Sequence, residues 1–293
     1  MTLCLRLNNW VIATTAAHKA LAKTIGLAGG ISVNQYRILA RLQAFERFDQ
    51  MRSLAKTLSL HPSTVTMTIK ELEAMNLVKT QWDKDDRRNT VVLCTERSVQ
   101  LIKDIDREIV DQVRQIWELY TTDELLLTYY DSLKTAANNR VISKYGLTLD
   151  NVERSYAECV FVNHATECRA LKKNGVSLSS FKILACLTDA PIGLSPIVIA
   201  GKVFLRPPEV SEALKKLEKQ GYVERQRSAS DQRYTYARIT EQALYDLDTF
   251  IVPDLLGALI AIIPEESRSK AHQYFDIAEK IVAAMHKTKE PPF

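Results

Sequence analysis

The stretch DKDDRRNTVVLCT, residues 83–95, combines a charged turn, a short alternating segment and a closing threonine. The stretch SASDQRYTYARIT, residues 228–240, has the same arrangement, with Asp-x-Arg in its turn. Alternating polar and apolar residues beside a charged turn are typical of one arm of a β-hairpin. Because this pattern occurs twice in one chain, we asked whether a whole domain is repeated.

One register relates the two halves of the chain. The segment GISVNQYRILARL, from Gly30, aligns with GVSLSSFKILACL, from Gly175, at an offset of 145 residues. The same offset pairs further markers: Pro62 with Pro207, Leu72 with Leu217, Asp86 with Asp231, and Thr95 with Thr240. A shared register across separate markers indicates a tandem repeat. We therefore predict two copies of one domain, at residues 1–148 and 149–293.

Composition excludes several classes of protein. The 293 residues are 46% hydrophobic and 25% charged, which is typical of globular domains. The sequence has no secretory leader and no apolar run of about 20 residues, so we expect a soluble, cytoplasmic protein without a membrane partner. The five cysteines are scattered and form no CxxC pair. Catalytic motifs and phosphate-binding glycine loops are missing, so we expect no enzyme, no catalytic residue, no metal and no cofactor.

The periodicity of the first copy predicts a helix at 7–25, a second one capped by Ser32, and a short one at 52–58. A fourth helix starts at Pro62, ends near Asn76, and buries Val65, Ile69 and Leu72. Two strands and two long helices follow, at 77–82, 89–94, 96–120 and 123–143. The second copy repeats this order, with helices at 195–203, 207–220, 241–262 and 265–286 and strands at 222–227 and 234–239.

A short helix, a turn and a second helix present one helix to the major groove of DNA in many regulators. The hairpin after them is typical of the wing of a winged helix. The long flanking helices are too apolar to stand alone and must pack on one another or on a partner. We therefore predict a mainly α fold with small β-wings: two winged helix-turn-helix domains joined through a helical core of the kind that mediates dimerisation.

These residues resemble the MarR family of bacterial winged-helix transcription regulators. The resemblance rests on DDRRNTVVLCTERS (85–98) and DQRYTYARITEQA (231–243), each preceded by a matching helix-turn-helix segment. It implies double-stranded DNA as partner. Two departures stand out: Cys94 and Ile239 replace the leucine that is usual before the threonine. Members of the family are normally homodimers, so two domains in one chain suggest a fused pseudo-dimer. A homodimer of the whole chain stays open.

Both predicted heads are locally basic. Residues 51–90 carry seven Lys and Arg against five Asp and Glu, and residues 196–235 carry eight against five. DNA binding needs cations near phosphates and hydrogen-bonding or apolar side chains at base edges. The predicted contact residues on the exposed helix faces are Ser63, Thr64, Thr66, Met67 and Lys70 in the first copy and Arg206, Glu209, Ser211, Glu212 and Lys215 in the second. A solvated helix face with ordinary charge pairs is the alternative.

The wings supply the remaining predicted contacts. Arg88 and Arg233 follow the apex of each turn, where an arginine can enter a narrow minor groove. The carboxylates of Asp86 and Asp231 can hold those guanidinium groups in place. Arg87 and Arg227 are predicted to contact phosphates. A surface salt bridge across each hairpin is the alternative, with a contribution of about 0–1 kcal/mol.

The resemblance also implies a small aromatic ligand bound between head and core. Five aromatic residues lie on helices that would build this region, although such residues are more often core: Trp10, Trp117, Tyr129, Tyr130 and Tyr156. We expect a sequence-specific repressor that reads an imperfect palindrome. One alternative is a protein-interaction module that has lost DNA binding, suggested by Glu209 and Glu212. The other is a thiol-based redox-sensing regulator.

Overall fold

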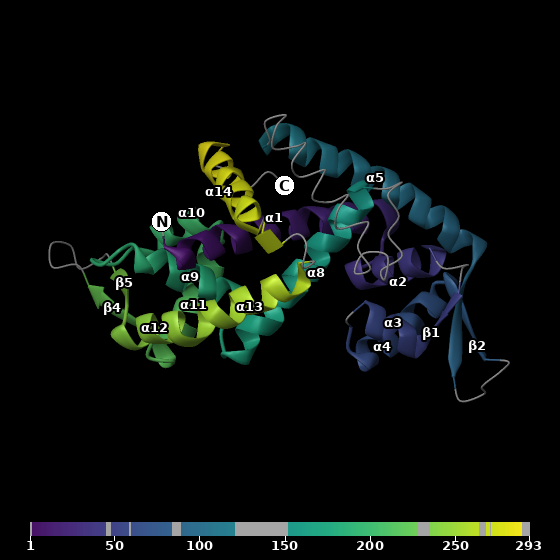
Figure 1. The fold of residues 1–293 in the computed structure, drawn as a ribbon, viewed down its shortest axis with the longest axis horizontal. Coiled ribbons are helices and arrows are strands. Elements are labelled where there is room, and N and C mark those ends of the chain that lie inside the picture. Colours follow the sequence, from purple (N-terminus) through teal and green to yellow (C-terminus); the bar gives the residue numbers. More distant parts are fainter. Residues whose placement is uncertain are drawn as a thin grey trace. The chain divides into compact units, whose positions relative to one another are not determined.

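The computed structural model describes residues 2–44, 48–58, 60–83, 89–120, 152–227, 235–263, 268–269 and 271–288 (Figure 1). The chain forms two compact units, one made of residues 18–162 and the other of residues 1–17 with 163–293. Each unit contains one winged-helix head. We call residues 30–95 the first head and residues 175–240 the second head. The predicted domain boundary at 148/149 lies outside the described residues.

The first head contains three helices and three strands. Its elements are α2 (Val33–Ala44), β1 (Phe48–Gln50), α3 (Met51–Thr57), α4 (Pro62–Ala74), β2 (Val78–Trp82) and β3 (Thr90–Cys94). The antiparallel sheet has the order β1-β3-β2, with Val78 opposite Cys94. The predicted helices and hairpin are confirmed. Strand β1 was not predicted, because three residues are too few to show a periodicity.

The second head repeats this order with one reduced strand. Its elements are α9 (Leu178–Thr188), α10 (Pro196–Val203), α11 (Pro207–Lys219), β4 (Val223–Arg227) and β5 (Thr235–Ile239). A single bridge between Leu194 and Ala237 replaces the third strand. Gly193, with φ +88°, precedes this bridge, and a Cβ there would lie 2.8 Å from the carbonyl oxygen of Ala237. Only glycine fits this close approach.

Two long helices are divided between the units. They are α1 (Leu3–Gly29) and α8 (Val152–Lys173), which occupy equivalent positions in the repeat. Residues 3–17 of α1 belong to the unit of the second head, where Leu7 and Val11 join Phe181 in the core. Residues 152–162 of α8 belong to the unit of the first head. Each head is thus packed with the opening segment of the other copy's first helix.

The helix that follows each wing differs between the copies. In the first copy it is α5 (Glu96–Tyr120), which is continuous. In the second copy a π-helical turn, η1 (Leu247–Ile251), separates α12 (Glu241–Asp246) from α13 (Val252–Ile262). The helix predicted over 241–262 is confirmed, with a π-turn inside it that the sequence analysis did not include. A π-turn has one residue more than an α-turn, and the buried positions shift accordingly: Ile105, Ile109 and Val113 correspond to Ile251, Leu255 and Leu259, at an offset of 146.

The last described helix is α14 (Ala271–Thr288), where the sequence predicted a helix over 265–286. Within the described ranges, no helix combines the length and the apolar character that crossing a bilayer requires. The helix predicted over 123–143 lies outside the described residues.

Candidate nucleic-acid interface

Helix α4 has one buried and one exposed face. Val65, Ile69 and Leu72 are buried, as predicted. At the start of the helix, Nδ1 of His61 accepts a hydrogen bond from the backbone N–H of Ser63 at 3.3 Å. Pro62 occupies the first turn, where a missing N–H leaves no partner unsatisfied. The cap and the packed face together hold α4 in place and leave its outer face to solvent.

The predicted DNA contacts of the first head lie on this outer face. Ser63, Thr66, Met67 and Lys70 are exposed, and Thr64 is half-buried. The Thr66 hydroxyl donates a hydrogen bond to the carbonyl oxygen of Pro62 at 3.0 Å, so its lone pairs are what it offers to a base or a water. Met67 is 59% exposed, which is unusual for a large apolar side chain and suits contact with a thymine methyl group.

Helix α11 has the same design. It buries Val210, Ala213, Leu214 and Leu217, and it exposes Arg206, Ser211, Glu212 and Lys215. Ser211 donates a hydrogen bond to the carbonyl oxygen of Pro207 at 3.0 Å. This is the bond that Thr66 makes at the equivalent position. The two helices therefore share this hydroxyl–carbonyl bond and a lysine, Lys70 or Lys215. They differ at three other positions of the repeat: Ser63/Pro208, Thr64/Glu209 and Met67/Glu212.

Glu209 has a structural role that the sequence prediction did not include. One oxygen, Oε2, accepts hydrogen bonds from both the backbone N–H and the side-chain Nε of Arg206, each at 3.0 Å. A glutamate at the third helical position that reaches back to the N-cap residue completes half of a capping box. Glu209 thus stabilises the start of α11 and orients Arg206.

The two heads differ more clearly in the exposed side chains of the helix before α4 or α11. Helix α3 exposes the basic residues Arg52 and Lys56. The repeat positions in α10 are Ile197, which is 74% exposed, and Gly201. In helix-turn-helix proteins this helix crosses the DNA backbone. Sequence reasoning missed the contrast, although the 145-residue offset makes it readable.

Most of the predicted wing contacts lie outside the described residues: Asp86, Arg87, Arg88, Asp231 and Arg233. The backbone of Arg227 ends β4 opposite Thr235, and its side chain is not described. At the equivalent end of β2 stands Trp82, which is 69% exposed. An exposed indole at the base of a wing was not predicted; its signal in the sequence is the alignment of Trp82 with Arg227.

The closing threonine of the opening pattern ties each wing to its helix. The hydroxyl of Thr95 donates to the carbonyl oxygen of Asn76 at 3.0 Å, and that of Thr240 to Gly221 at 2.8 Å. Asn76 and Gly221 have φ of 56° and 76°, the left-handed conformation that ends a helix. Each threonine oxygen also caps the next helix through the N–H of Ser98 or Ala243. The repeated threonine thus joins the end of the helix, the wing and the following helix.

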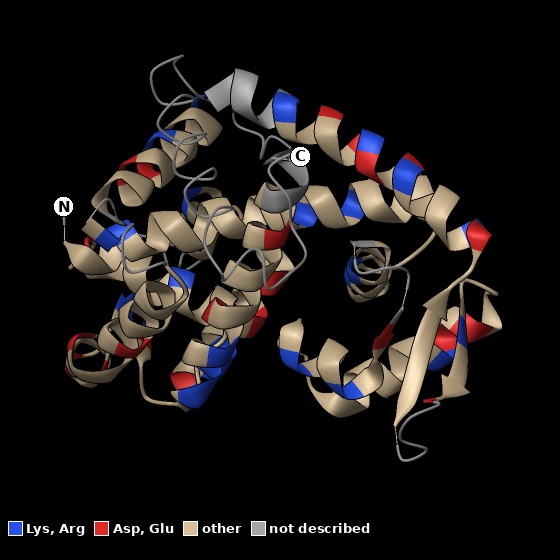
Figure 2. Cartoon of the chain, turned by 45° about the vertical axis from the view of Figure 1, so that its right-hand side comes forward, with Lys and Arg blue, Asp and Glu red and all other residues tan. Residues whose placement is uncertain are grey.

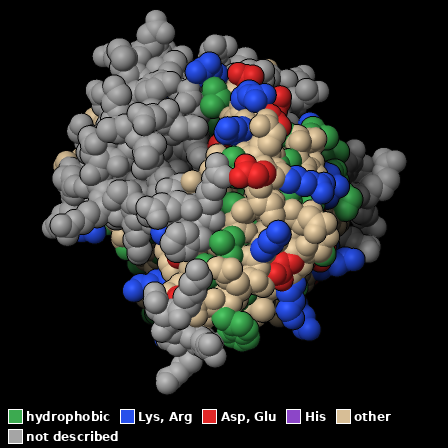
Figure 3. All heavy atoms as spheres, turned by 90° about the vertical axis from the view of Figure 1, so that its right-hand side faces the viewer, with side chains coloured by type: hydrophobic (Ala, Val, Ile, Leu, Met, Phe, Trp, Pro, Cys, Tyr) green, Lys and Arg blue, Asp and Glu red, His purple; other side chains and the backbone are tan. Residues whose placement is uncertain are grey.

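Charge is interleaved around the first head. Figure 2 shows Lys and Arg alternating with Asp and Glu along α5. Figure 3 shows the side on which β2 and α5 lie, where Lys and Arg are spread among acidic and polar groups. On this side, the described Lys and Arg residues are therefore mixed with acidic groups and do not form one continuous basic patch.

The aromatic residues considered for a ligand site are dispersed. Trp10 is half-buried and packs edge-on against Phe275, with ring centroids 5.6 Å apart. Tyr156 is buried. Tyr129, Tyr130 and the side chain of Trp117 lie outside the described residues. The described aromatics are therefore packed as core.

Buried titratable groups bear on the redox alternative. Burial raises the pKa of the Cys4 and Cys159 thiols to about 12 and that of Cys186 to about 11. Burial also raises the pKa of Cys168. Thiols held protonated are poor nucleophiles, so these four cysteines do not suit a redox sensor. In the described part of the chain, no group of three or more His, Cys, Asp and Glu residues could hold a metal ion.

The sequence model of the MarR family matches residues 31–90 and 176–235, one match inside each head. No curated protein matches the chain in sequence. Among solved structures, a MarR-family transcriptional regulator from Rhodococcus sp. RHA1 is 26% identical over 43% of this chain and 84% of its own, with a TM-score of 0.35. AbsC, a MarR-family transcriptional regulator from Streptomyces coelicolor, is 25% identical over 43% and 84%, with a TM-score of 0.37. The YusO protein from Bacillus subtilis is 19% identical over 42% and 86%, with a TM-score of 0.36. The two family matches, in one register and each on a winged-helix head, show that this chain contains two tandem MarR-like domains.

Proposed function

We propose that this chain is a sequence-specific DNA-binding transcription regulator that acts as a repressor. The observation that carries the proposal is the outer face of α4 and α11. Each face stands on a buried scaffold and carries hydroxyl, basic and base-reading side chains at equivalent positions. Through these helices, the two heads would enter successive major grooves about one helical turn apart.

The two half-sites should differ. Met67 favours a thymine methyl group, whereas the carboxylate of Glu212 accepts a hydrogen bond from the amino group of cytosine. A carboxylate also repels nearby phosphates, so the second head should bind its half-site more weakly. The preferred operator is therefore an imperfect palindrome. We assign phosphate and minor-groove contacts to Arg87, Arg88, Arg227 and Arg233, supported by Asp86 and Asp231.

One chain should act as an intramolecular pseudo-dimer of two domains, residues 1–148 and 149–293. The support is the exchange of helical segments: residues 3–17 pack in the unit of the second head, and residues 152–162 in that of the first. In two separate chains such an exchange would produce an intertwined dimer. Here both partners of the exchange are covalently linked. A ligand bound among the core helices would release DNA only if it favours a head spacing that DNA does not.

The test is selection from random-sequence duplex DNA at two salt concentrations, with wild type beside Arg88→Ala and Arg233→Ala. We expect an enriched, imperfectly palindromic site, weakened by both substitutions, with affinity that falls steeply with salt. Enrichment that depends on Arg88 but not on Arg233 would leave the second head without a reading role. Weak binding without enrichment would contradict the proposal.

A protein-interaction module is the second candidate, and one observation favours it. The second head exposes Ile192, Ile197 and Val198 at 91%, 74% and 43%. Exposed apolar side chains before and on α10, followed by the acidic Glu212 on α11, are unusual for a DNA-facing surface. Salt dependence separates the candidates, because apolar docking survives salt that displaces a protein from phosphates.

A further inference from the structure

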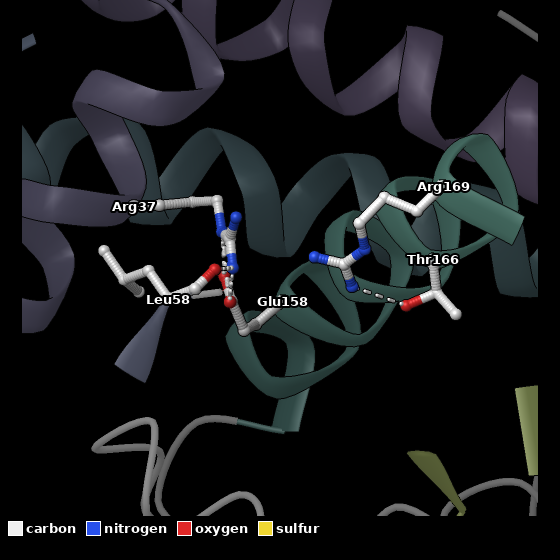
Figure 4. Close-up of polar contacts among 5 residues, drawn as sticks. All are labelled: Arg37, Leu58, Glu158, Thr166 and Arg169. Atoms are coloured by element: carbon white, nitrogen blue, oxygen red, sulfur yellow. Dashed lines mark hydrogen bonds and ion pairs between the residues drawn. The ribbon is translucent and has the colours of Figure 1, made fainter. Parts of the chain in front are cut away.

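A buried arginine joins three helices in the unit of residues 18–162. Arg37 on α2 places Nε 3.0 Å from each carboxylate oxygen of Glu158 on α8, and its Nη2 lies 2.5 Å from Oε1 (Figure 4). The same Nη2 donates a hydrogen bond to the carbonyl oxygen of Leu58 at 3.1 Å. The two side chains are 3% and 11% exposed, so water competes little with these bonds.

The hydrogen bond to the Leu58 carbonyl oxygen lies at the C-terminal end of α3. Leu58 is the C-cap residue of α3, the first helix of the helix-turn-helix in this head. The last carbonyl oxygens of a helix have no partner within the helix. Arg37 supplies one, and its charge also suits the negative end of the helix dipole. The guanidinium therefore holds the end of α3 and a core helix at the same time.

We propose that Arg37 and Glu158 are positioning residues that fix the helix-turn-helix of the first head against α8. The pair acts through the C-terminal end of α3 and the turn that follows it, and so sets how α4 is presented. This inference rests on the proposed function, because presentation matters only if α4 reads DNA. It also extends that function: the acid lies in the second copy's first helix, so the second copy controls the first head.

The neighbouring histidine leaves the pair undisturbed near neutral pH. Burial, and then the charge of Arg37, lower the pKa of His18. Its ring packs edge-on against Phe161, with centroids 5.8 Å apart. A neutral imidazole does not compete with the guanidinium for Glu158.

The second head has a different arrangement at the equivalent position. Lys182 replaces Arg37 at the repeat offset, and it is 2% exposed. Its electrostatic neighbour is Glu167, which is also on α8 and fully buried. A lysine is a point charge and cannot make the two parallel bonds of a guanidinium fork. The bidentate pairing of Arg37 with Glu158 is therefore specific to the first head.

The test uses a double variant, Arg37→Met with Glu158→Met, in the full-length chain. Replacing both members of a buried ion pair by apolar residues of similar size is often neutral for stability, so the variant should fold. The matched control is Arg107→Met with Asp104→Met, which removes an exposed ion pair from the same unit. Arg37→Lys is the conservative variant, because it keeps the charge and loses the fork.

Two measurements follow, one of which needs no DNA. The first is hydrogen exchange of the backbone amides of residues 51–74, which should be faster in the double variant at unchanged thermal stability. The second is binding to the duplex that wild type selects, which should weaken by about tenfold, with loss of discrimination confined to the half-site of the first head. Arg37→Lys should give an intermediate effect, and the control should match wild type.

The outcomes separate this inference from the proposed function. If wild type selects no DNA, the regulator proposal fails, and the exchange measurement still decides whether the pair holds the head. If exchange over 51–74 matches wild type, the positioning role is wrong, whatever the DNA result. Equal weakening at both half-sites would also overturn it, because that result indicates a general structural effect.

Discussion

The two heads share a scaffold and differ in what they place on it. In each head a residue in the left-handed conformation, Asn76 or Gly221, follows the end of α4 or α11. In each head a threonine hydroxyl then bonds the carbonyl oxygen of that residue and so connects the helix to the wing. In contrast, the exposed positions have diverged: Met67 becomes Glu212, and Arg52 becomes Ile197. The helix-ending conformation and the threonine contact are common to both heads, while several exposed positions differ. The difference therefore indicates two unlike exposed surfaces on one kind of head.

The largest effect should come from the shared scaffold. Leu72 and Leu217 are equivalent and fully buried. Leu72→Ala and Leu217→Ala should each lower the free energy of unfolding by about 2–5 kcal/mol, because each leaves a cavity under its helix. Denaturant unfolding of both variants measures this, with the exposed Leu27→Ala as control. A small cost in only one head would show that the scaffolds are not equivalent.

The stability of the unit that contains the second head should depend on pH through Glu167. Burial raises the pKa of Glu167 to about 8, against the opposing influence of Thr14, Trp10 and Lys182. A carboxyl whose pKa is raised by folding contributes its full stability below its unfolded pKa and loses it as pH rises through the folded value. From about pH 4.5 to 8 this group should therefore lower stability by up to about 1.4 kcal/mol per pH unit.

Glu167→Gln keeps the shape and removes the charge, so it should abolish this pH dependence and raise stability most at and above pH 8. Unfolding free energies from pH 5 to 9 measure it. The exposed Glu224→Gln serves as control in the same unit. Parallel curves for wild type and Glu167→Gln would show that Glu167 is charged and solvated in the folded chain.

Exchanging the differing residues should exchange base preference. Met67→Glu should make the first head favour cytosine where it favoured thymine, and Glu212→Met should do the reverse in the second head. Each change should shift discrimination by about 1–3 kcal/mol. Selection from random DNA with each variant measures it. An unchanged base preference in both variants would mean that these side chains do not reach the bases.

The smallest effect concerns a phosphate contact proposed for the helix before each reading helix, α3 or α10. Arg52→Ile should reduce the slope of log affinity against log salt by about 0.9, the value for one lost phosphate contact, and Ile197→Arg should increase it by as much. Titration of the selected duplex at several salt concentrations measures both. If both variants changed the salt dependence in the same direction, the assignment of this phosphate contact to Arg52 of the first head would be wrong.

Local patterns with their own chemistry were predictable. The hairpins, the Pro-started helices and the buried Val65, Ile69 and Leu72 follow from alternation, capping and helical spacing. Glu209 was read as a base contact, but its side chain reaches back to the backbone N–H of Arg206. Arginine is not among the usual N-cap residues, so the sequence carried no clear capping signal. The π-turn at Leu247–Ile251 was missed because periodicity cannot locate a single extra residue in an apolar helix.

Long-range features were beyond sequence reasoning. Arg37 and Glu158 are 121 positions apart in the sequence. They pair because residues 152–162 of α8 belong to the unit of the first head, which the sequence does not reveal. The exchange of segments between copies has the same origin. The repeat shows that both copies have the same helices, but not which copy each helix packs against.

The central claim is that one chain carries two unlike DNA-reading heads. The most direct measurement is the affinity and stoichiometry of the purified chain on three duplexes: the selected site, a symmetric site built from the first half-site twice, and one built from the second half-site twice. We predict that the selected site binds tightest, with one chain per duplex. Equal or tighter binding to either symmetric site, with two chains per duplex, would contradict the claim.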